Sequence, residues 1–533
     1  MLRVLPRRRL LATLVALLLG AVALTGCTVQ TVGRGTRGST APSASASASP
    51  SPSTPGVPKI DFSDCTKLVD PQGAGVPADR ARNLTISCGK AAVPLDYDNP
   101  NAGTVSLYVL KIHDDTGHGQ QPLVVNPGGP GGSSVSLAVG LAGQVSADLL
   151  QHYDLIGLDP RGVGLSSPVT CLDDKEKDSV FAAAPDVRTP QGLAQAQQIA
   201  QTWVQGCQGA AGSALGDYNT VYTARDMDLV RQALGGGKLD YLGFSYGTQL
   251  GATYATMFPG SIDRMVLDGA IDPGQSYAVK SETQTAGFEL AFDQFASDCV
   301  TKPACAAMGN PANAVTQLAA QAAASGGIPV STAGETRKAT AGIVYTAVAE
   351  ALYDQSEWST MAEAVIAGQK GDGKQLLALA DQYDQRDSQG HYTNLLDAFQ
   401  IVSCNDGGVT YSDADLTAFG NDWAVKYPVF GAYFAGQMAM CNGWPQSAHP
   451  APTEVPAPGA PPIVVVGTVH DPATPYANAG ALANSLGPGV GTLLSWDGQG
   501  HTAYLKSDCI DKAVDAYLLA GTLPAANTTC PAK

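Results

Sequence analysis

The sequence predicts an α/β fold, in which a mostly parallel sheet is covered by helices on both faces and carries an inserted helical cap. Short apolar strands alternate with helices from about residue 103, which is typical of buried parallel sheets. Between residues 275 and 450 the helical period alone dominates. The chain has 533 residues, of which 44% are hydrophobic and 15% charged, a globular composition that allows one large core with an insertion.

The elements of this core follow in chain order. Strands are expected at 105–112, 122–125, 153–158, 239–243, 264–267, 462–466 and 492–496. Helices are expected at 223–234, 248–257 and 509–519. In the cap, two stripes at helical spacing are expected to be core contacts: Phe288, Phe292 and Phe295, and Val344, Val348 and Leu352. We therefore expect the core to comprise 59–274 and 451–533, and the cap 275–450.

The first 58 residues predict export. Four arginines precede an apolar run from Leu10 to Leu24 that is too short to be a confident membrane span, which is typical of a signal peptide over 1–26. Leu24-Thr25-Gly26-Cys27 is similar to a bacterial lipobox, which predicts a lipid anchor on Cys27; simple secretion is the alternative. Residues 27–58 are rich in Ser, Ala and Pro and should form a flexible tether. We expect an exported protein, either a cell-envelope lipoprotein or a secreted one.

The cysteines fit an oxidising compartment. The chain has 11, and ten remain if Cys27 carries lipid. An even set in an exported protein indicates disulfides, and close CxxC pairs typical of zinc sites are absent from the sequence. Sequence alone does not determine the pairing. Pairing of neighbours in chain order gives short loops and is our expectation: Cys65–Cys88, Cys171–Cys207, Cys299–Cys305, Cys404–Cys441 and Cys509–Cys530.

The charge excludes one class of partner. The formal net charge is −16 at pH 7, which argues against binding to nucleic acid because phosphates need cations to neutralise them. The sequence contains no nucleotide-binding loop, metal site or membrane span after residue 26. We expect a monomer without a cofactor, which meets the membrane only through its anchor.

A nucleophile is predicted at Ser245. It lies in Gly243-Phe244-Ser245-Tyr246-Gly247, between an expected strand and an expected helix of small residues. A serine in such a sharp turn is exposed for attack, and the flanking glycines remove side chains that would clash there. The GxSxG pattern is weak evidence by itself. The expected strand before it and helix after it strengthen the prediction of a nucleophile.

A serine hydroxyl needs a histidine base near neutral pH, and the base needs a carboxylate to hold its tautomer. His501 follows the last long strand and is the predicted base. The other histidines after Ser245 fit less well, since they lie in or beside the cap or at the place expected for the acid: His391, His449 and His470.

The predicted acid is Asp471, which follows the strand at 462–466. Asp268, after an earlier strand, and Asp497, near the base, are alternatives; Asp497 fits better as a turn former. Thr474 is a candidate to orient the carboxylate of Asp471 by a hydrogen bond.

The developing oxyanion requires backbone N–H donors that are already in place. One is expected from Tyr246, directly after the nucleophile, and the other from Gly129 in the glycine loop Asn126-Pro127-Gly128-Gly129-Pro130-Gly131-Gly132-Ser133. Such a loop could instead cradle phosphate, but no GK[ST] or GxGxxG pattern follows and its prolines fit that role badly.

These motifs together resemble a known family. NPGGPGGS, DPRGVGLS, GFSYGTQLGATYA, the Cys404-Asn405-Asp406 run, GTVHDPATPYANA and GQGHTAY resemble, in this order, motifs of the secreted tripeptidyl aminopeptidases of actinobacteria. These are relatives of prolyl aminopeptidases with the α/β-hydrolase fold, and the resemblance covers about residues 60–530. It implies Ser245 as nucleophile, Asp471 as acid and His501 as base. It also implies removal of short peptides or single residues from free N-termini, with the cap closing the far end of the cleft.

An aminopeptidase needs an anion for the substrate ammonium, since an unpaired buried charge is costly. Three acids near the expected cap entrance are candidates: Glu282, Glu289 and Asp406. A carboxylesterase with the same triad needs no such anion and is one alternative. A lipid-anchored binding protein without turnover is another, but it would leave the motifs unexplained.

Overall fold

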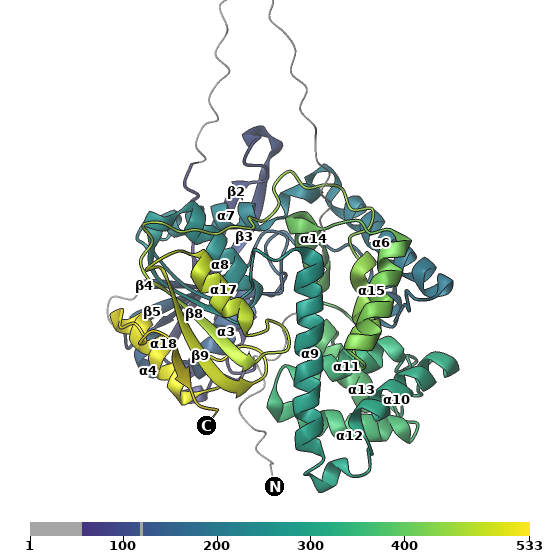
Figure 1. Cartoon of the computed structure of the whole chain (residues 1–533). Coiled ribbons are helices and arrows are strands. Elements are labelled where there is room, and N and C mark those ends of the chain that lie inside the picture. Colours follow the sequence, from purple (N-terminus) through teal and green to yellow (C-terminus); the bar gives the residue numbers. More distant parts are fainter. Residues whose placement is uncertain (1–55, 118–120, 533) are drawn as a thin grey trace, which may run out of the picture.

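The computed structural model describes residues 56–117 and 121–532 (Figure 1). The predicted signal peptide, Cys27 and all but the last residues of the tether lie outside these residues. In the described part, ten strands form one sheet in the order β1-β2-β3-β5-β4-β6-β7-β8-β9-β10. The strands β5, β4, β6, β7, β8, β9 and β10 are parallel to one another. β3 pairs antiparallel with β5, and β2 and β1 continue this antiparallel part of the sheet. Their bounds are β1 Ser63–Asp64, β2 Leu84–Pro94, β3 Thr104–Asp114, β4 Gln121–Asn126, β5 Tyr153–Leu158, β6 Leu239–Phe244, β7 Ile262–Asp268, β8 Ile463–His470, β9 Gly491–Gln499 and β10 Thr528–Cys530.

Helices cover both faces of this sheet. One face packs on α7 (Thr220–Ala233), α8 (Tyr246–Met257) and α17 (Ala477–Ser485), and the other on α3 (Ser134–Gln144), α4 (Ala147–His152) and α18 (Asp508–Ala520). Alternate strand residues supply the two cores: Val124 belongs to the first and Leu123 and Val125 to the second. The predicted α/β class is confirmed. The short helices α1 (Thr66–Val69) and α2 (Ala78–Ala81) lie between β1 and β2 in the chain.

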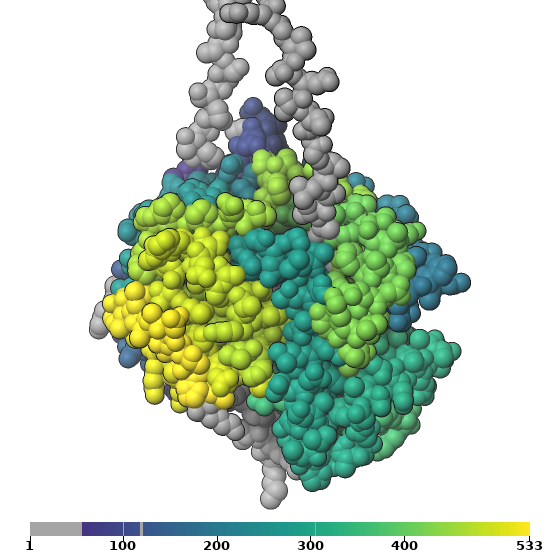
Figure 2. Space-filling model, viewed as in Figure 1, coloured from purple at the N-terminus to yellow at the C-terminus, as the bar shows by residue number. Residues whose placement is uncertain are grey.

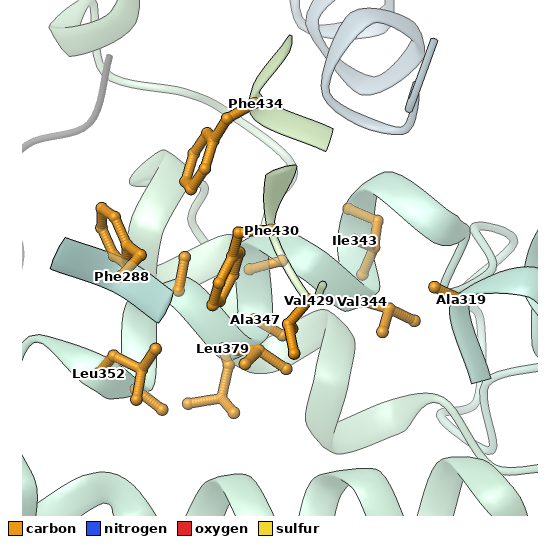
Figure 3. Packing of buried hydrophobic residues seen from close by; sticks show 14 of the residues in the cluster. Phe288, Ala319, Ile343, Val344, Ala347, Leu352, Leu379, Val429, Phe430 and Phe434 are labelled. Carbon is orange, nitrogen blue, oxygen red and sulfur yellow. The ribbon is translucent and has the colours of Figure 1, made fainter. Parts of the chain in front are cut away.

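A helical layer lies beside the sheet (Figures 1 and 2). In Figure 2 the teal segment around α9 lies between the yellow C-terminal part of the core and the green cap helices. The layer comprises α9 (Tyr277–Cys299), α10 (Pro311–Ser325), α11 (Ala341–Leu352), α12 (Trp358–Gln369), α13 (Lys374–Asp384), α14 (Leu395–Gly407), α15 (Asp413–Lys426) and α16 (Gly431–Gly436). Phe288 packs with ring centroids 5.7 Å from Phe430 and 5.3 Å from Phe434 (Figure 3). Both predicted apolar stripes are buried in this core.

The cap core also includes an earlier segment of chain. Helices α5 (Asp174–Phe181) and α6 (Pro190–Ala211) pack in the same buried cluster as α9 to α16. The buried face of α6 repeats at helical spacing, through Ala196, Ala200, Trp203 and Cys207. This segment falls in the predicted core range 59–274, because the helical texture that predicts the cap begins only at about residue 275. The structure builds the cap from two stretches of chain, on either side of β6, α8 and β7.

The part of the chain that the structure describes contains five disulfides. They are Cys65–Cys88, Cys171–Cys207, Cys299–Cys305, Cys404–Cys441 and Cys509–Cys530, with Cα–Cα distances of 4.3 to 5.7 Å. The expected pairing of neighbours is confirmed. No helix within 56–117 or 121–532 is long and apolar enough to cross a membrane.

Candidate active site

The predicted site residues lie where parallel strands end. Ser245 follows β6, Asp471 follows β8 and His501 follows β9 by one residue. The glycine loop follows β4. Because the carboxyl ends of parallel strands share one edge of a sheet, these four loops converge there.

Ser245 lies in a strained turn. Its φ of 54° and ψ of −122° place a residue other than glycine in a region that costs about 1–3 kcal/mol. Both neighbouring glycines are required by space: a Cβ on Gly243 would lie 2.6 Å from Gly247 O, and one on Gly247 would lie 2.9 Å from Asn126 O. Ser245 N donates to Asp268 O at 2.8 Å. The serine hydroxyl is buried and forms no hydrogen bond within the described residues.

Asp471 and His501 form a hydrogen-bonded pair. The Nδ1 atom of His501 lies 2.8 and 2.9 Å from the two carboxylate oxygens of Asp471. Both residues are buried. Thr474 donates to this carboxylate through its backbone N at 2.8 Å and its hydroxyl at 3.1 Å. The backbone N–H groups of Ala473 and Thr502 donate to it as well, so the acid is held from several directions. This geometry fixes the imidazole with Nε2 free to act.

Ser245 and His501 both adjoin one corner of the sheet. The corner is Asp268-Gly269, where Asp268 O accepts Ser245 N. A Cβ on Gly269 would lie 3.2 Å from His501 Cε1, the ring atom next to Nε2. Like the serine hydroxyl, His501 Nε2 is buried and without a hydrogen bond in the described residues. The two atoms that a proton transfer would join are thus both held unpaired beside the same corner.

The glycine loop adjoins the nucleophile. A Cβ on Gly128 would lie 2.9 Å from both Ser245 Cβ and Tyr246 N, and the φ of Gly128 is +96°. Gly129, with φ +114°, lines the cavity described below together with Tyr246. Asn126 Oδ1 accepts the Gly128 N–H at 2.9 Å and fixes the loop. The expected oxyanion donors, Gly129 and Tyr246, therefore border the same space, and Gly128 provides the closest backbone approach.

Residues of the cap contact the loops of the site. The sequence did not predict these contacts. Tyr353, just after α11, packs edge-on against His501 with centroids 5.3 Å apart, and its carbonyl accepts His501 N at 2.9 Å. Gln284 of α9 donates to Ala473 O, beside the acid, at 3.0 Å. Gly131 lies so close to α14 that a Cβ would collide with Leu395 O. These contacts join residues far apart in the chain, so no local pattern reveals them.

A cavity opens between the glycine loop and the cap. Gly129, Pro130 and Tyr246 line it from the core, and Lys280, Ser403 and Asp406 line it from α9 and α14. Burial raises the pKa of Asp406 to about 6, against hydrogen bonds from Thr220 N at 2.9 Å and Thr220 Oγ1 at 2.5 Å and the charge of Lys280. Burial lowers the pKa of Lys280. Ser403 Oγ is buried and forms no hydrogen bond in the described residues.

Of the three acids proposed for the substrate ammonium, only Asp406 lines this cavity. Glu282 accepts from Lys426 at 2.8 Å and from the hydroxyl of Tyr427 at 3.3 Å. Glu289 accepts the backbone N–H groups of Val429 and Phe430 at the start of α16. Both glutamates are therefore engaged in the cap, away from the glycine loop.

None of the alternative bases and acids forms the pair that His501 and Asp471 form in the described residues. The histidines pair with other partners: His391 with Asp174, His449 with Tyr222 and His470 with Gly498 O. Asp497 is exposed in β9. Asp268 does reach the site, but its carboxylate accepts the backbone N–H groups of Ala503 and Tyr504 rather than His501.

Comparisons with known proteins agree with this architecture. Residues 427–530 match the family model described as TAP-like protein. Serine protease Hip1 of Mycobacterium tuberculosis is 36% identical over 457 residues, 83% of this chain and 87% of the relative. Carboxylesterase B of the same species is 36% identical over 489 residues, 90% and 92% of the two chains. Tripeptidyl aminopeptidase of Streptomyces lividans is 30% identical over 492 residues, 88% and 86%.

Among solved structures, an α/β hydrolase from a deep-sea metagenome library aligns with a TM-score of 0.36 and 10% identity, covering 79% of this chain and 96% of the other. Proline iminopeptidase of Mycobacterium smegmatis aligns with a TM-score of 0.33 and 15% identity, covering 81% and 100%. From the extent and identity of the sequence matches, the chain belongs to the tripeptidyl-aminopeptidase-like family of serine hydrolases, and its fold is that of the α/β hydrolases.

Proposed function

We propose that the protein is an exported serine peptidase that releases short peptides, tripeptides in particular, from free N-termini. Ser245 is the nucleophile, His501 the base and Asp471 the acid. Two relatives named serine protease and tripeptidyl aminopeptidase support the peptidase class. The observation that carries the aminopeptidase assignment is Asp406, a carboxylate in the cavity that borders the glycine loop.

The proposed reaction follows from the arrangement of the loops. Ser245 Oγ attacks the scissile carbonyl carbon while His501 Nε2 takes its proton, and Asp471 stabilises the imidazolium that forms. The amides of Tyr246 and Gly129 donate to the oxyanion. The tetrahedral intermediate collapses, and His501 gives its proton to the leaving amine. A water molecule then attacks the acyl-enzyme by the same route and frees the peptide and Ser245 Oγ.

In this proposal Asp406 sets the length of the released peptide by binding its ammonium group. It is joined to the oxyanion residue Tyr246 through Thr220, whose hydroxyl contacts both the Tyr246 hydroxyl and Asp406. Two hydrogen bonds and the side chain of Tyr246 therefore link the Asp406 carboxylate to the backbone of Tyr246. Three extended residues span about 10 Å, and the proposal requires a tripeptide whose third carbonyl lies at Ser245 to bring its ammonium to Asp406. The unpaired Ser403 hydroxyl between them could hydrogen-bond the bound backbone.

Export is proposed from the first 58 residues and is supported by the five disulfides, which persist in oxidising compartments. In this proposal the protein is a monomer that acts on peptides without a cofactor and meets the membrane only through a lipid on Cys27.

A carboxylesterase is the second candidate. The relative named carboxylesterase B is as similar in sequence as Hip1. An ester substrate would use the same serine, histidine and oxyanion donors, but it would not depend on Asp406.

The test compares chromogenic tripeptide, single-residue and simple ester substrates, each peptide with a free and an acetylated N-terminus. We expect cleavage of free-amine tripeptides only. Ser245→Ala should lower kcat by at least about 10⁴-fold, because nothing else can form the acyl-enzyme. Ester cleavage with no dependence on the amine would establish the esterase instead, and full activity of Ser245→Ala would overturn the nucleophile.

Asp406→Asn tests the ammonium site. Loss of the carboxylate should raise KM for free-amine tripeptides by about 10²-fold, since a buried charge pair is worth about 2–5 kcal/mol, with a smaller change in kcat. Glu282→Gln is the matched control, because that acid lies outside the cavity and its KM should not change. Equal effects of the two substitutions would contradict the role of Asp406.

A further inference from the structure

A second pocket lies within the cap. Its walls are largely aromatic and apolar and come from both stretches of the cap: Phe181, Trp203, Leu396, Phe399, Tyr433 and Met440. Several of these side chains are only partly covered, so the pocket presents apolar surface that the fold itself does not fill. We refer to it as the cap pocket.

The cap pocket also contains an unpaired carboxylate. Asp384, the last residue of α13, lines the pocket, is only 5% exposed, and forms no hydrogen bond or ion pair in the described residues. Burial raises its pKa well above the usual value; the charges of Asp381 and Asp178 act in the same direction, and the charge of Arg337 opposes them. Gln437 Oε1, on the same wall, is a buried acceptor to which no donor within the described residues is hydrogen-bonded. Buried acceptors of this kind are costly unless a donor reaches them.

The neighbouring cations are already engaged. Arg337 binds Glu335 at 2.8 Å and Asp381 at 2.6 Å, and Arg386 binds Asp178 at 2.9 Å. Neither guanidinium forms an ion pair with Asp384 in the described residues. A cation that entered the pocket would therefore displace no ion-pair partner of Asp384 among the described residues.

The cap pocket adjoins the reactive centre by two routes. Phe399 of α14 lines both the cap pocket and the cavity that contains Asp406 and the glycine loop. Tyr383, beside Asp384, lies 6.2 Å from Tyr353 between ring centroids, and Tyr353 lies 5.3 Å from His501. A long side chain of a peptide bound at the nucleophile could therefore enter the pocket.

We propose that the cap pocket is a specificity subsite for a lysine or arginine side chain of the released peptide. The alkyl stem would pack along the aromatic walls, and the cation would bind Asp384 and the carbonyl of Gln437. Aromatic faces and a desolvated carboxylate both favour such a cation. This inference rests on the proposed peptidase function, of which it names the substrate class.

The test uses free-amine tripeptide substrates in which each of the three positions in turn carries lysine or arginine, or the neutral analogues norleucine and citrulline. At one position the basic residue should raise kcat/KM at least about tenfold over its analogue. Asp384→Asn should reduce this ratio to about twofold or less while leaving hydrolysis of the norleucine peptide intact, which also shows that the variant folds. Glu363→Gln, an exposed acid on α12, is the matched control and should keep the full ratio.

A second variant guards against misfolding of the first. Leu396→Lys places a tethered cation at the wall of the pocket and should abolish the preference in the same way. The inference is overturned if basic residues are favoured at no position, or if the preference survives in both variants. Cleavage of neutral peptides without a basic preference would contradict the subsite alone and leave the peptidase proposal standing.

Failure of the peptidase proposal gives a different result. If peptides are not cleaved, calorimetry with Ser245→Ala still compares binding of the lysine and norleucine tripeptides. Tighter binding of the lysine peptide, lost in Asp384→Asn, would support the subsite without turnover, and equal binding would overturn it.

Discussion

At the end of β7, Asp268 binds both halves of the active site. Its carbonyl oxygen accepts Ser245 N at 2.8 Å, and its carboxylate accepts Ala503 N and Tyr504 N, two and three residues after His501. Burial raises its pKa to about 6, against these backbone donors. Asp268 is an alternative acid by its position in the sequence, but its contacts link the nucleophile turn to the loop of the base.

Asp268→Asn tests this positioning role. Oδ1 of Asp268 accepts Ala503 N at 3.1 Å, and Oδ2 accepts both Ala503 N and Tyr504 N. With the one acceptor oxygen of an amide in the Oδ2 position, its NH₂ group would replace Oδ1, face the Ala503 N–H and displace the loop after His501. Because a small displacement of a catalytic group is costly, we expect kcat to fall by about 10²-fold with little change in KM. Steady-state kinetics on the preferred tripeptide measures this, and a change confined to KM would contradict it. Asp497→Asn, at an exposed site in β9, is the control.

Local motifs are sufficient to place the principal candidates in the chain. Ser245, Asp471 and His501 each follow an apolar strand directly, and the structure brings their loops to one edge of the sheet. Tyr353 could not be predicted in this way, because its contact with His501 joins the cap to the core across more than a hundred residues of chain. Choosing among Glu282, Glu289 and Asp406 likewise required knowing which helix faces the glycine loop.

Among the elements, the contact between the glycine loop and α14 determines the position of the oxyanion donors. Gly131 has a φ of +104°, and a Cβ there would collide with Leu395 O and lie 3.1 Å from Phe399 N. The loop therefore rests directly on the backbone of the helix that carries Asp406. A change in one should be transmitted to the other.

Gly131→Ala tests this contact. The strain and the collision should destabilise the fold by about 1–3 kcal/mol and lower kcat, because the loop must move away from Ser245. Gly480→Ala is the matched control, since Gly480 lies within α17 with open space around it and alanine favours helices by up to about 1 kcal/mol. Thermal unfolding and kcat of both variants provide the check, and equal stability of the two would contradict the prediction.

Two elements show why the sequence predicted less than the whole fold. The strand β2 contains Gly89, Ala91 and Ala92, residues with weak strand preference, and it is held by full antiparallel pairing with β3. Helix α6 has a clear helical period, but that period does not reveal which layer its apolar face contacts. Tertiary pairing decides both, and single-sequence patterns contain only the local part of this information.

Across the whole molecule, buried carboxyls predict an unusual dependence of stability on pH. Burial is the main cause that raises five pKa values, to about 6 for Asp217, Asp268, Asp406 and Asp511, and to about 7 for Asp240. These groups bind protons more tightly in the folded than in the unfolded chain, whose value is 3.8. Their contribution is fully present below about pH 4 and is lost as the pH rises through 6 to 7.

The melting temperature should therefore fall as the pH rises from 5 to 8. Some acids act in the opposite direction: Arg337 holds the pKa of Glu335 at about 2, so that contribution is lost only below about pH 4. Calorimetry at fixed ionic strength measures the profile. Asp240→Asn should flatten it between pH 6 and 8, because the carboxyl with the highest of these values is removed. A melting temperature that rises from pH 5 to 8 would contradict this account.

The chain enters and leaves the cap twice, and β6, Ser245, α8 and β7 lie between the two passages. During synthesis, α5 and α6 therefore lack their packing partners until the chain has been made as far as α16. Until then Trp203 has no cap core to be buried in. By then the nucleophile turn has been made, whereas the strands that precede Asp471 and His501 have not. The cap consequently cannot be excised, or exchanged with that of a relative, as a single contiguous segment. It matures only together with the catalytic sheet that it covers.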